Sequence, residues 1–84
     1  MVESLSIDEV DKIILNVFPN PSSDYWHISS SKIINSIEVY DLTGKKVFFS
    51  YPNAKEVTLS ELELPSGLFI LVINKNNTLR LVKN

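Results

Sequence analysis

The stretch IEVYDLTGKKV, residues 37–47, decides how this chain folds. Its apolar residues Ile37 and Val39 alternate with polar neighbours, which is the two-residue period of a half-buried strand. Gly44 then allows a tight turn, because glycine accepts a positive φ without a Cβ clash. A second alternating segment begins directly after the turn, so residues 37–47 are a β-hairpin by local chemistry alone.

Similar signals recur on both sides of this hairpin. Apolar runs separated by Pro, Asn and Gly breaks predict seven short strands, over residues 12–17, 25–30, 36–42, 45–51, 56–59, 68–74 and 78–82. Residues 68–73 are continuously apolar, so we expect the strand 68–74 to be central and covered on both faces. Breaks at intervals of about 8 to 12 residues favour a sandwich over a βαβ fold. We therefore expect an all-β fold, a seven-stranded antiparallel β-sandwich that is immunoglobulin-like.

The aromatic side chains divide into two groups. Packing in the core explains one group, Trp26, Phe49 and Phe69, of which Phe49 is in phase with Val47. The other group, Tyr25, Tyr40 and Tyr51, is expected at exposed positions. Leu62 and Leu64 are expected to reach the core from an irregular connection.

Composition limits the class of protein. The chain has 84 residues, enough for one domain at most, and a formal net charge of −2. No basic stripe is present to neutralise phosphates, so we expect no nucleic-acid partner. The chain has no cysteine, so the domain must be held together by packing, without disulfides.

The first residues differ from the rest of the chain. Residues 1–11 are polar and acidic, and we expect a linker or N-terminal arm, followed by the β-sandwich domain over residues 12–84. The arm lacks the apolar core of a secretory signal peptide, and no apolar run is long enough to span a bilayer. If the domain is exported, the export information is expected elsewhere in a larger parent protein.

Candidate catalytic and metal-binding residues have simpler explanations. The single histidine, His27, lies opposite the Trp26 face, and a solvated surface position is favoured for it. The carboxylates Asp24, Glu38 and Asp41 fall in turns and on exposed strand faces, where paired general acids are not expected. The acidic cluster Asp8, Glu9 and Asp11 lacks the glycine and the terminal glutamate of an EF-hand loop. We expect no enzyme activity, no catalytic residue, no bound metal and no cofactor.

Three motifs, in order, carry a resemblance to a known family. They are VFPNP at residues 17–21, the hairpin at residues 37–47, and LPSGLFILVI at residues 64–73 followed by TLRLVK at 78–83. Together they resemble the type A C-terminal sorting domain of the type IX (Por) secretion system of Bacteroidota-type bacteria, over about residues 13–84. Phe18 and Phe69 stand where that family often has tyrosine, so each ring is kept and a hydroxyl is lost.

The resemblance implies a signal and not a catalyst. The parent would cross the inner membrane by a separate N-terminal signal, pass through the periplasm, and reach the cell surface or the medium. The implied partners are the outer-membrane translocon, a sortase-like protease that usually removes the domain, and the N-terminal cargo domain of the parent. The cut would fall within or before residues 1–12.

The motifs also supply the expected recognition residues. These are Pro19, Asn20, Pro21, Gly44, Lys45, Gly67, Arg80 and Lys83. We expect residues 67–83 to carry the recognition surface, since a terminal edge strand can recruit a partner by strand addition. The simpler alternative is that Gly67 only turns the chain and the basic residues only keep the edge soluble.

Other functions stay open on the sequence. An adhesive or carbohydrate-binding sandwich module would need an exposed aromatic row. An enzyme would need a cleft with a perturbed acid or base, and a passive spacer would leave export unchanged when deleted.

Overall fold

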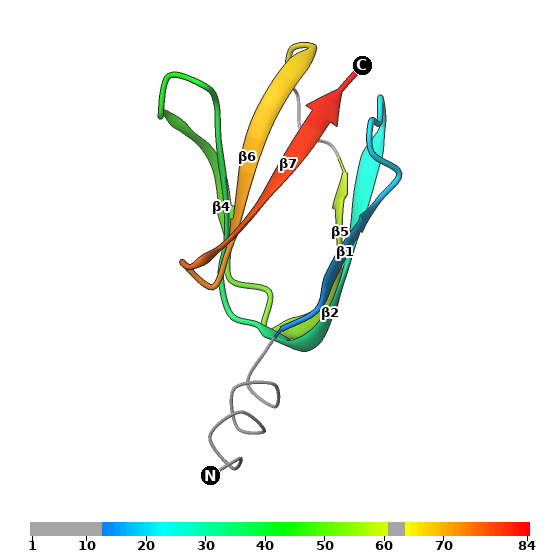
Figure 1. Ribbon diagram of the computed structural model, residues 1–84, viewed down its shortest axis with the longest axis vertical. Coiled ribbons are helices and arrows are strands. Elements are labelled where there is room, and N and C mark those ends of the chain that lie inside the picture. The colour runs from blue at the N-terminus through cyan, green and yellow to red at the C-terminus, as the bar shows by residue number, and fades with distance from the viewer. Residues whose placement is uncertain (1–12, 61–63) are drawn as a thin grey trace, which may run out of the picture.

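The computed structural model describes residues 13–60 and 64–84, and in them every regular element is a β-strand. The strands are β1 (Leu15–Phe18), β2 (Tyr25–Ile34), β3 (Ile37–Tyr40), β4 (Lys46–Ser50), β5 (Ala54–Ser60), β6 (Gly67–Ile73) and β7 (Asn77–Lys83). They form two antiparallel sheets, in the orders β1-β2-β5 and β4-β3-β6-β7 (Figure 1). The predicted all-β class and the seven strands are confirmed. The expected arm at residues 1–11, the acidic cluster in it and Leu62 lie outside the described residues.

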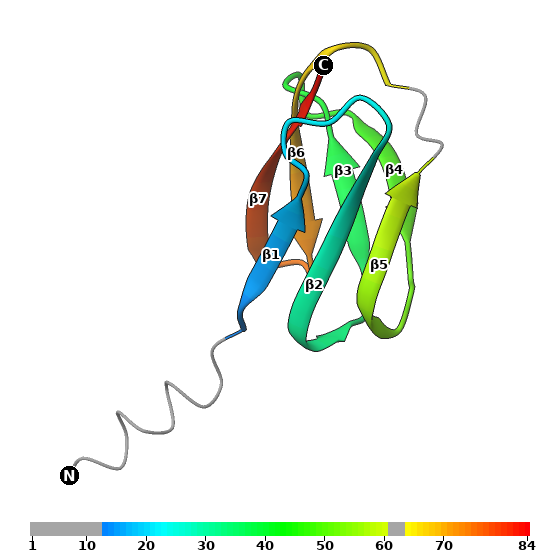
Figure 2. The same ribbon diagram turned by 90° about the vertical axis from the view of Figure 1, so that its right-hand side faces the viewer.

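A single core lies between the two sheets, which face one another in Figures 1 and 2. The three-stranded sheet contributes Trp26, Ile28, Ile34 and Leu59, and the four-stranded sheet contributes Ile37, Val39, Phe69, Leu71, Ile73 and Leu81. These side chains come from alternate positions of their strands, as the period-two pattern requires. Leu64 packs against the same core, as its sequence position predicts.

Strand β2 is longer than the pattern predicts. It continues past residue 30 to Ile34, a fully buried residue, and its register with β5 shifts between Ser29 and Ile34. The sequence Ser30-Ser31-Lys32 is polar, so it does not show strand alternation even though its backbone stays extended. The polar run therefore hid the second half of the strand.

The predicted core position of Phe49 is wrong. Its side chain is 57% exposed, while Val47 and Phe48 both pack against the core. The cause is a register shift between β3 and β4, since Val39 pairs with Phe48 but Tyr40 pairs with Lys46, leaving Val47 as an extra residue. Such a β-bulge reverses the facing of the residues beyond it.

Strand β6 is central, as predicted, because it pairs with β3 on one side and β7 on the other. Its inward residues Phe69, Leu71 and Ile73 are buried. Its outward residues Leu68, Ile70 and Val72 are half-buried. The core face of β6 is therefore fully covered, as expected, whereas its outer face is only half covered.

The three sequence motifs meet at one end of the sandwich. The connection after β1, the β3–β4 turn, the start of β6 and the end of β7 all lie at the upper end in Figures 1 and 2. The β2–β3, β4–β5 and β6–β7 connections lie at the lower end, where β1 also begins. We call these the motif end and the opposite end. Within the described residues, no helix could cross a lipid bilayer.

Candidate recognition site

The Pro-Asn-Pro segment lies along the outer edge of the last strand. Ser22 forms a parallel bridge with Lys83, although β1 and β7 belong to different sheets. The peptide bonds Phe18–Pro19 and Asn20–Pro21 are cis. We call residues 19–22 the strap, because they join the edge of the three-stranded sheet to the edge of the four-stranded sheet.

The Asn20 side chain makes the central contact of the strap. Its Nδ2 donates to the Arg80 carbonyl at 2.8 Å, and its Oδ1 accepts from the Val82 N–H at 2.9 Å. An amide side chain carries one donor group and one acceptor, so it can pair with a strand edge as a backbone peptide would. Asn20 thereby satisfies two edge groups of β7, and the prolines on either side of it have no backbone N–H with which to donate to the Arg80 carbonyl.

Ser22 continues the strap with backbone and hydroxyl bonds. Its N–H donates to the Val82 carbonyl at 2.9 Å, and its carbonyl accepts from the Asn84 N–H at 3.0 Å. Its buried hydroxyl accepts from the Tyr25 N–H at 3.0 Å and also donates to the Tyr25 carbonyl. The hydroxyl therefore fixes the turn that leads from the strap into β2.

Lys83 and Gly67 lie beside the strap. They pair in the β6–β7 register, and the Lys83 ammonium donates to the Leu64 carbonyl at 2.9 Å. Gly67 has a φ of +144°, which L side chains rarely adopt, although a Cβ there would meet no atom within 4 Å. Glycine is needed at this position for its backbone conformation and not for space. Arg80 is exposed, and its backbone carbonyl is the group that Asn20 holds.

The β3–β4 turn is organised by Asp41. Its Oδ1 accepts from the Thr43 hydroxyl at 2.6 Å, from the Thr43 N–H at 2.9 Å and from the Lys45 N–H at 3.0 Å. The Thr43 hydroxyl bond, followed by the Lys45 backbone bond, lowers the pKa of the Asp41 carboxyl below its ordinary value. Gly44 follows with a φ of +91°. The predicted glycine turn is therefore confirmed, with an aspartate as its organiser.

The structure brings most of the expected recognition residues together. Along the β7 edge of the four-stranded sheet lie Pro19, Asn20, Pro21, Arg80 and Lys83, and Gly67 of the adjacent strand β6 pairs with Lys83. Gly44 and Lys45 lie at the same end of the sandwich, but on the β3–β4 turn. The expected recognition residues did not include Ser22, Asp41 or Leu64, which also support this end of the molecule. The pattern Asp-x-Thr-Gly could have indicated Asp41, because aspartate side chains often bond to the backbone two residues later.

His27 is more enclosed than the sequence indicates. Its side chain is 27% exposed, with Nε2 3.4 Å from Glu56 and Nδ1 3.0 Å from the Thr58 hydroxyl. The Phe18 ring lies against it, with the ring centroids 5.2 Å apart. The expected position on the surface opposite Trp26 agrees with this partial exposure, and the neighbouring strands β1 and β5 supply partners on the same face.

The candidate carboxylates do not form a pair. Glu38 lies 3.1 Å from the Lys46 ammonium, and that bond is the first cause of a lowered Glu38 pKa. Asp41 is held in its turn, and Asp24 lies in the turn that Ser22 fixes. Among the residues that the structure describes, no group of three His, Cys, Asp or Glu side chains could hold a metal ion.

Comparison with known proteins now places the chain in a family. Residues 16–84 match the family described as "Secretion system C-terminal sorting domain". The chain is also 33% identical, over 81 residues, to a protein of Formosa agariphila named "Endo-acting ulvan lyase". That alignment covers 90% of this chain but 16% of the length of the lyase.

The chain belongs to this family of sorting domains, whose members direct proteins through the type IX secretion system. It is therefore a sorting signal, and the family is not a catalytic one. Such a signal implies a larger parent protein, involvement with the secretion machinery, and export to the cell surface or the medium.

Proposed function

We propose that residues 12–84 direct a larger parent protein, whose cargo precedes them, across the periplasm and through the outer-membrane translocon. A sortase-like protease then removes the domain by cutting within or before residues 1–12, and residues 1–11 serve as a linker. The observation that carries this proposal is the family match over residues 16–84, which includes all three motifs.

The relative from Formosa agariphila supports the proposal that any chemical activity belongs to the cargo. Its alignment covers 16% of a protein named as a lyase, so the matched region is small beside the rest of that protein. We infer the same arrangement here, with the chemistry in the cargo and none in residues 12–84. Glu38 is bound to Lys46, and Asp41 is bound within its own turn, so these carboxylates are not arranged as a catalytic pair. This arrangement supports a non-enzymatic domain.

The fold supports an immunoglobulin-like topology. The orders β1-β2-β5 and β4-β3-β6-β7 resemble those of immunoglobulin-type sandwiches, with the difference that the fourth strand joins the sheet of the third, sixth and seventh.

A fusion experiment tests the proposed function. The 84-residue chain is placed after a reporter that carries an N-terminal signal, in a host with intact or disrupted type IX machinery. We expect the reporter at the cell surface or in the medium of the intact host and in the periplasm of the disrupted host. Equal export by both hosts would refute the proposal.

Recognition is proposed to use residues 67–83 at the motif end, together with the strap and the Gly44–Lys45 turn. Arg80 is the cleanest probe, because its side chain is exposed and has no hydrogen bond or ion pair within the described residues. Lys83 is less suitable, since its ammonium also holds the Leu64 carbonyl.

The test compares Arg80→Gln with Lys55→Gln, which removes an exposed lysine from β5 in the other sheet. The fluorescence of Trp26, whose side chain is buried in the core, first shows that both variants fold. We expect Arg80→Gln alone to lower export of the reporter. If export is unchanged with Arg80→Gln, the Arg80 side chain is not needed for recognition and serves only to keep the edge soluble.

A further inference from the structure

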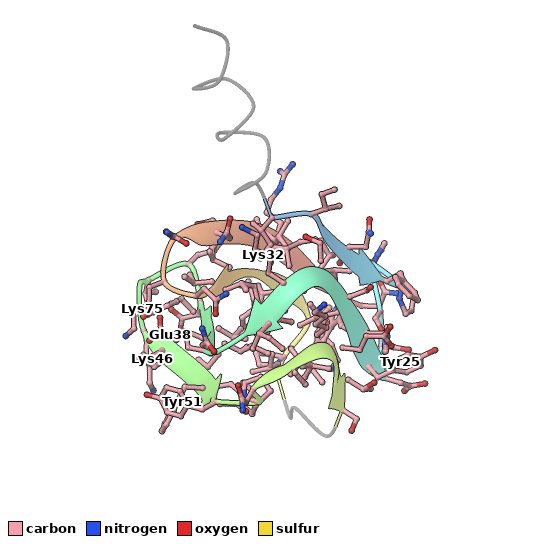
Figure 3. The ribbon with its side chains drawn as sticks, turned by 90° about the horizontal axis from the view of Figure 1, so that it is seen from below. Tyr25, Lys32, Glu38, Lys46, Tyr51 and Lys75 are labelled. Atoms are coloured by element: carbon pink, nitrogen blue, oxygen red, sulfur yellow. The ribbon has the colours of Figure 1, made fainter. Side chains whose placement is uncertain are left out.

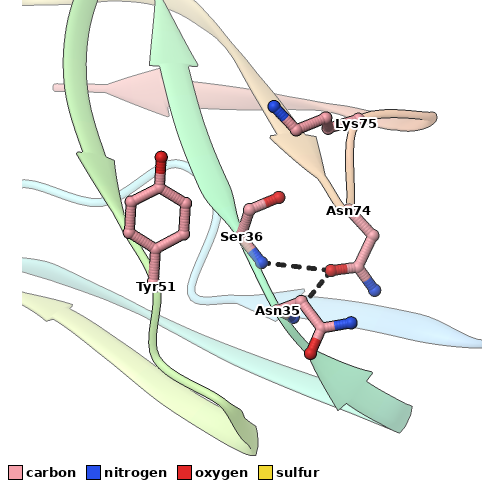
Figure 4. Close-up of a pocket in the computed structure, with 5 residues that line it drawn as sticks. All are labelled: Asn35, Ser36, Tyr51, Asn74 and Lys75. Carbon is pink, nitrogen blue, oxygen red and sulfur yellow. Dashed lines mark hydrogen bonds between the residues drawn. The ribbon is translucent and has the colours of Figure 1, made fainter.

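The opposite end of the sandwich carries a hollow that the sorting function does not use. It is lined by Asn35, Ser36, Tyr51, Asn74 and Lys75 (Figure 4). The sheet register explains why they meet, because Ser50, Ile37 and Ile73 pair across β4, β3 and β6. The residues adjoining these pairs, Tyr51, Ser36 and Asn74, therefore stand side by side where the three strands end.

The floor of the hollow is fixed by the Asn74 amide. Its Oδ1 accepts from the Asn35 N–H at 2.7 Å and from the Ser36 N–H at 3.1 Å, and its Nδ2 donates to the Ile33 carbonyl at 3.1 Å. Asn74 and Lys75 both have positive φ, 53° and 68°, as a tight turn between β6 and β7 requires. The hollow is thus already formed without a ligand, which lowers the entropy lost on binding.

One wall of the hollow is an exposed aromatic ring. Tyr51 is 69% exposed, and Phe49 beside it is 57% exposed. The two rings meet edge to face, with centroids 6.0 Å apart, so each restricts the orientation of the other. The hydroxyl of Tyr51 and the side-chain amide of Asn35 have no hydrogen-bond partner within the described residues.

The charge near the hollow is positive. Glu38 is neutralised by Lys46 at 3.1 Å, and the Lys46 ammonium also lies 5.6 Å from the centre of the Phe49 ring. Lys75 forms no salt bridge within the described residues, but its charge also contributes to the lowered Glu38 pKa, so two lysines stand against one carboxylate near the hollow. Figure 3 shows Lys75, Glu38, Lys46 and Tyr51 gathered on one side of the molecule, far from Tyr25.

We propose that this hollow is a binding site for an acidic oligosaccharide, with a uronate sugar at its centre. An exposed ring can stack on the apolar face of a sugar, and the Asn35 amide and the Tyr51 hydroxyl can bond to its hydroxyl groups. Lys75 supplies the charge complement of a carboxylate. Most of the exposed lining of the hollow is apolar, which suits the apolar face of a sugar ring, and its polar groups are amides, hydroxyls and an ammonium.

This site is separate from the sorting surface. The strap and the ends of β6 and β7 that carry the motif lie at the other end of the sandwich. A saccharide bound in the hollow would leave the motif end uncovered. The inference therefore does not depend on the proposed recognition surface, and its failure would leave that proposal intact.

A titration with two matched sugars tests the inference. The 15N-labelled chain is titrated with a β-1,4-linked tetraglucuronate and with cellotetraose, which share a backbone and differ in the carboxylates. We expect amide shifts at residues 35, 36, 51, 74 and 75 with tetraglucuronate, and binding about threefold or more weaker with cellotetraose. No shift at these residues with tetraglucuronate would overturn the site.

Two pairs of variants separate the ring from the charge. Tyr51→Ala is expected to weaken tetraglucuronate binding about tenfold, whereas Tyr25→Ala, which removes an exposed ring from the other sheet, leaves it unchanged. Lys75→Gln is expected to remove the preference for the acidic sugar, and Lys55→Gln to keep it. Unweakened binding by Tyr51→Ala would overturn the proposal.

A peptide control distinguishes a sugar from an acidic protein segment. Tetraglutamate carries the same number of side-chain carboxylates without a sugar ring. We expect its shifts to be weaker than those of tetraglucuronate and insensitive to Tyr51→Ala. Equal affinity for the peptide and the sugar would overturn the saccharide assignment in favour of an acidic peptide.

Discussion

At the scale of single residues, Asn20 does for β7 what a neighbouring strand would do. Its amide meets one carbonyl and one N–H of the edge at 2.8 and 2.9 Å. An open edge strand invites pairing with another chain, and this contact closes part of the edge with a side chain. The asparagine is therefore both a recognition candidate and a structural group.

Replacing Asn20 by alanine is expected to destabilise the domain by about 1–2 kcal/mol, because two hydrogen bonds to a strand edge are lost. Chemical denaturation of the variant measures the change. Asn16→Ala is the matched control, since Asn16 is exposed on β1 and its side chain makes no hydrogen bond within the described residues. A loss no larger than that of the control would contradict the role given to Asn20.

Asp41 makes the stability of the β3–β4 turn depend on pH. Its pKa is lowered from the ordinary value of 3.8, so the carboxylate stabilises the folded state fully above that value. This contribution is lost as the pH falls through the lowered folded pKa. Because the Thr43 hydroxyl bond is the first cause, Thr43→Val is expected to raise the Asp41 pKa, as carboxyl carbon NMR would measure. A pKa unchanged by Thr43→Val would argue against that cause.

At the scale of elements, the bulge in β4 decides which aromatic ring faces the core. Phe48 packs against the core and Phe49 is 57% exposed. We expect Phe48→Ala to lower the free energy of unfolding by about 1.5–3 kcal/mol and Phe49→Ala by about 1 kcal/mol or less. Urea denaturation of both variants tests this. A larger loss of unfolding free energy with Phe49→Ala than with Phe48→Ala would instead place Phe49 in the core, as regular alternation predicts.

The strands also show which parts of the fold can be predicted from local sequence patterns. The presence of all seven strands follows from apolar patterns and turn residues, since these depend on neighbours in the chain, but the polar second half of β2 does not. The bulge at Val47 leaves no such signal, because the apolar run Val47-Phe48-Phe49 is compatible with either ring facing inward. The strap is a different case. Pro-Asn-Pro predicts a break, but its partner lies about sixty residues away in sequence and nothing local indicates it.

At the scale of the whole molecule, one core holds two sheets together without a disulfide. Trp26, the single tryptophan, is 2% exposed in that core. Its Nε1 has no hydrogen-bond partner within the described residues, so the ring is held by packing. Its fluorescence therefore reports on the contact between the sheets, whereas far-ultraviolet circular dichroism reports on the strands.

We expect both signals to change at the same temperature in a thermal melt, because neither sheet can bury its inner face alone. Tyr25→Ala, which alters an exposed ring next to Trp26, serves as a control and should keep the two midpoints together. A tryptophan transition well below the circular dichroism transition would show that the sheets separate before they unfold.

The strap also sets an order of events. Its bonds join residues 20 and 22 to residues 80, 82 and 84, so nearly the whole domain must be synthesised before they can form. Non-local contacts of this kind form late in folding, because the chain between them must first be brought together. The motif end is therefore completed only when β7 has reached the strap, so a partly folded domain does not present the complete signal.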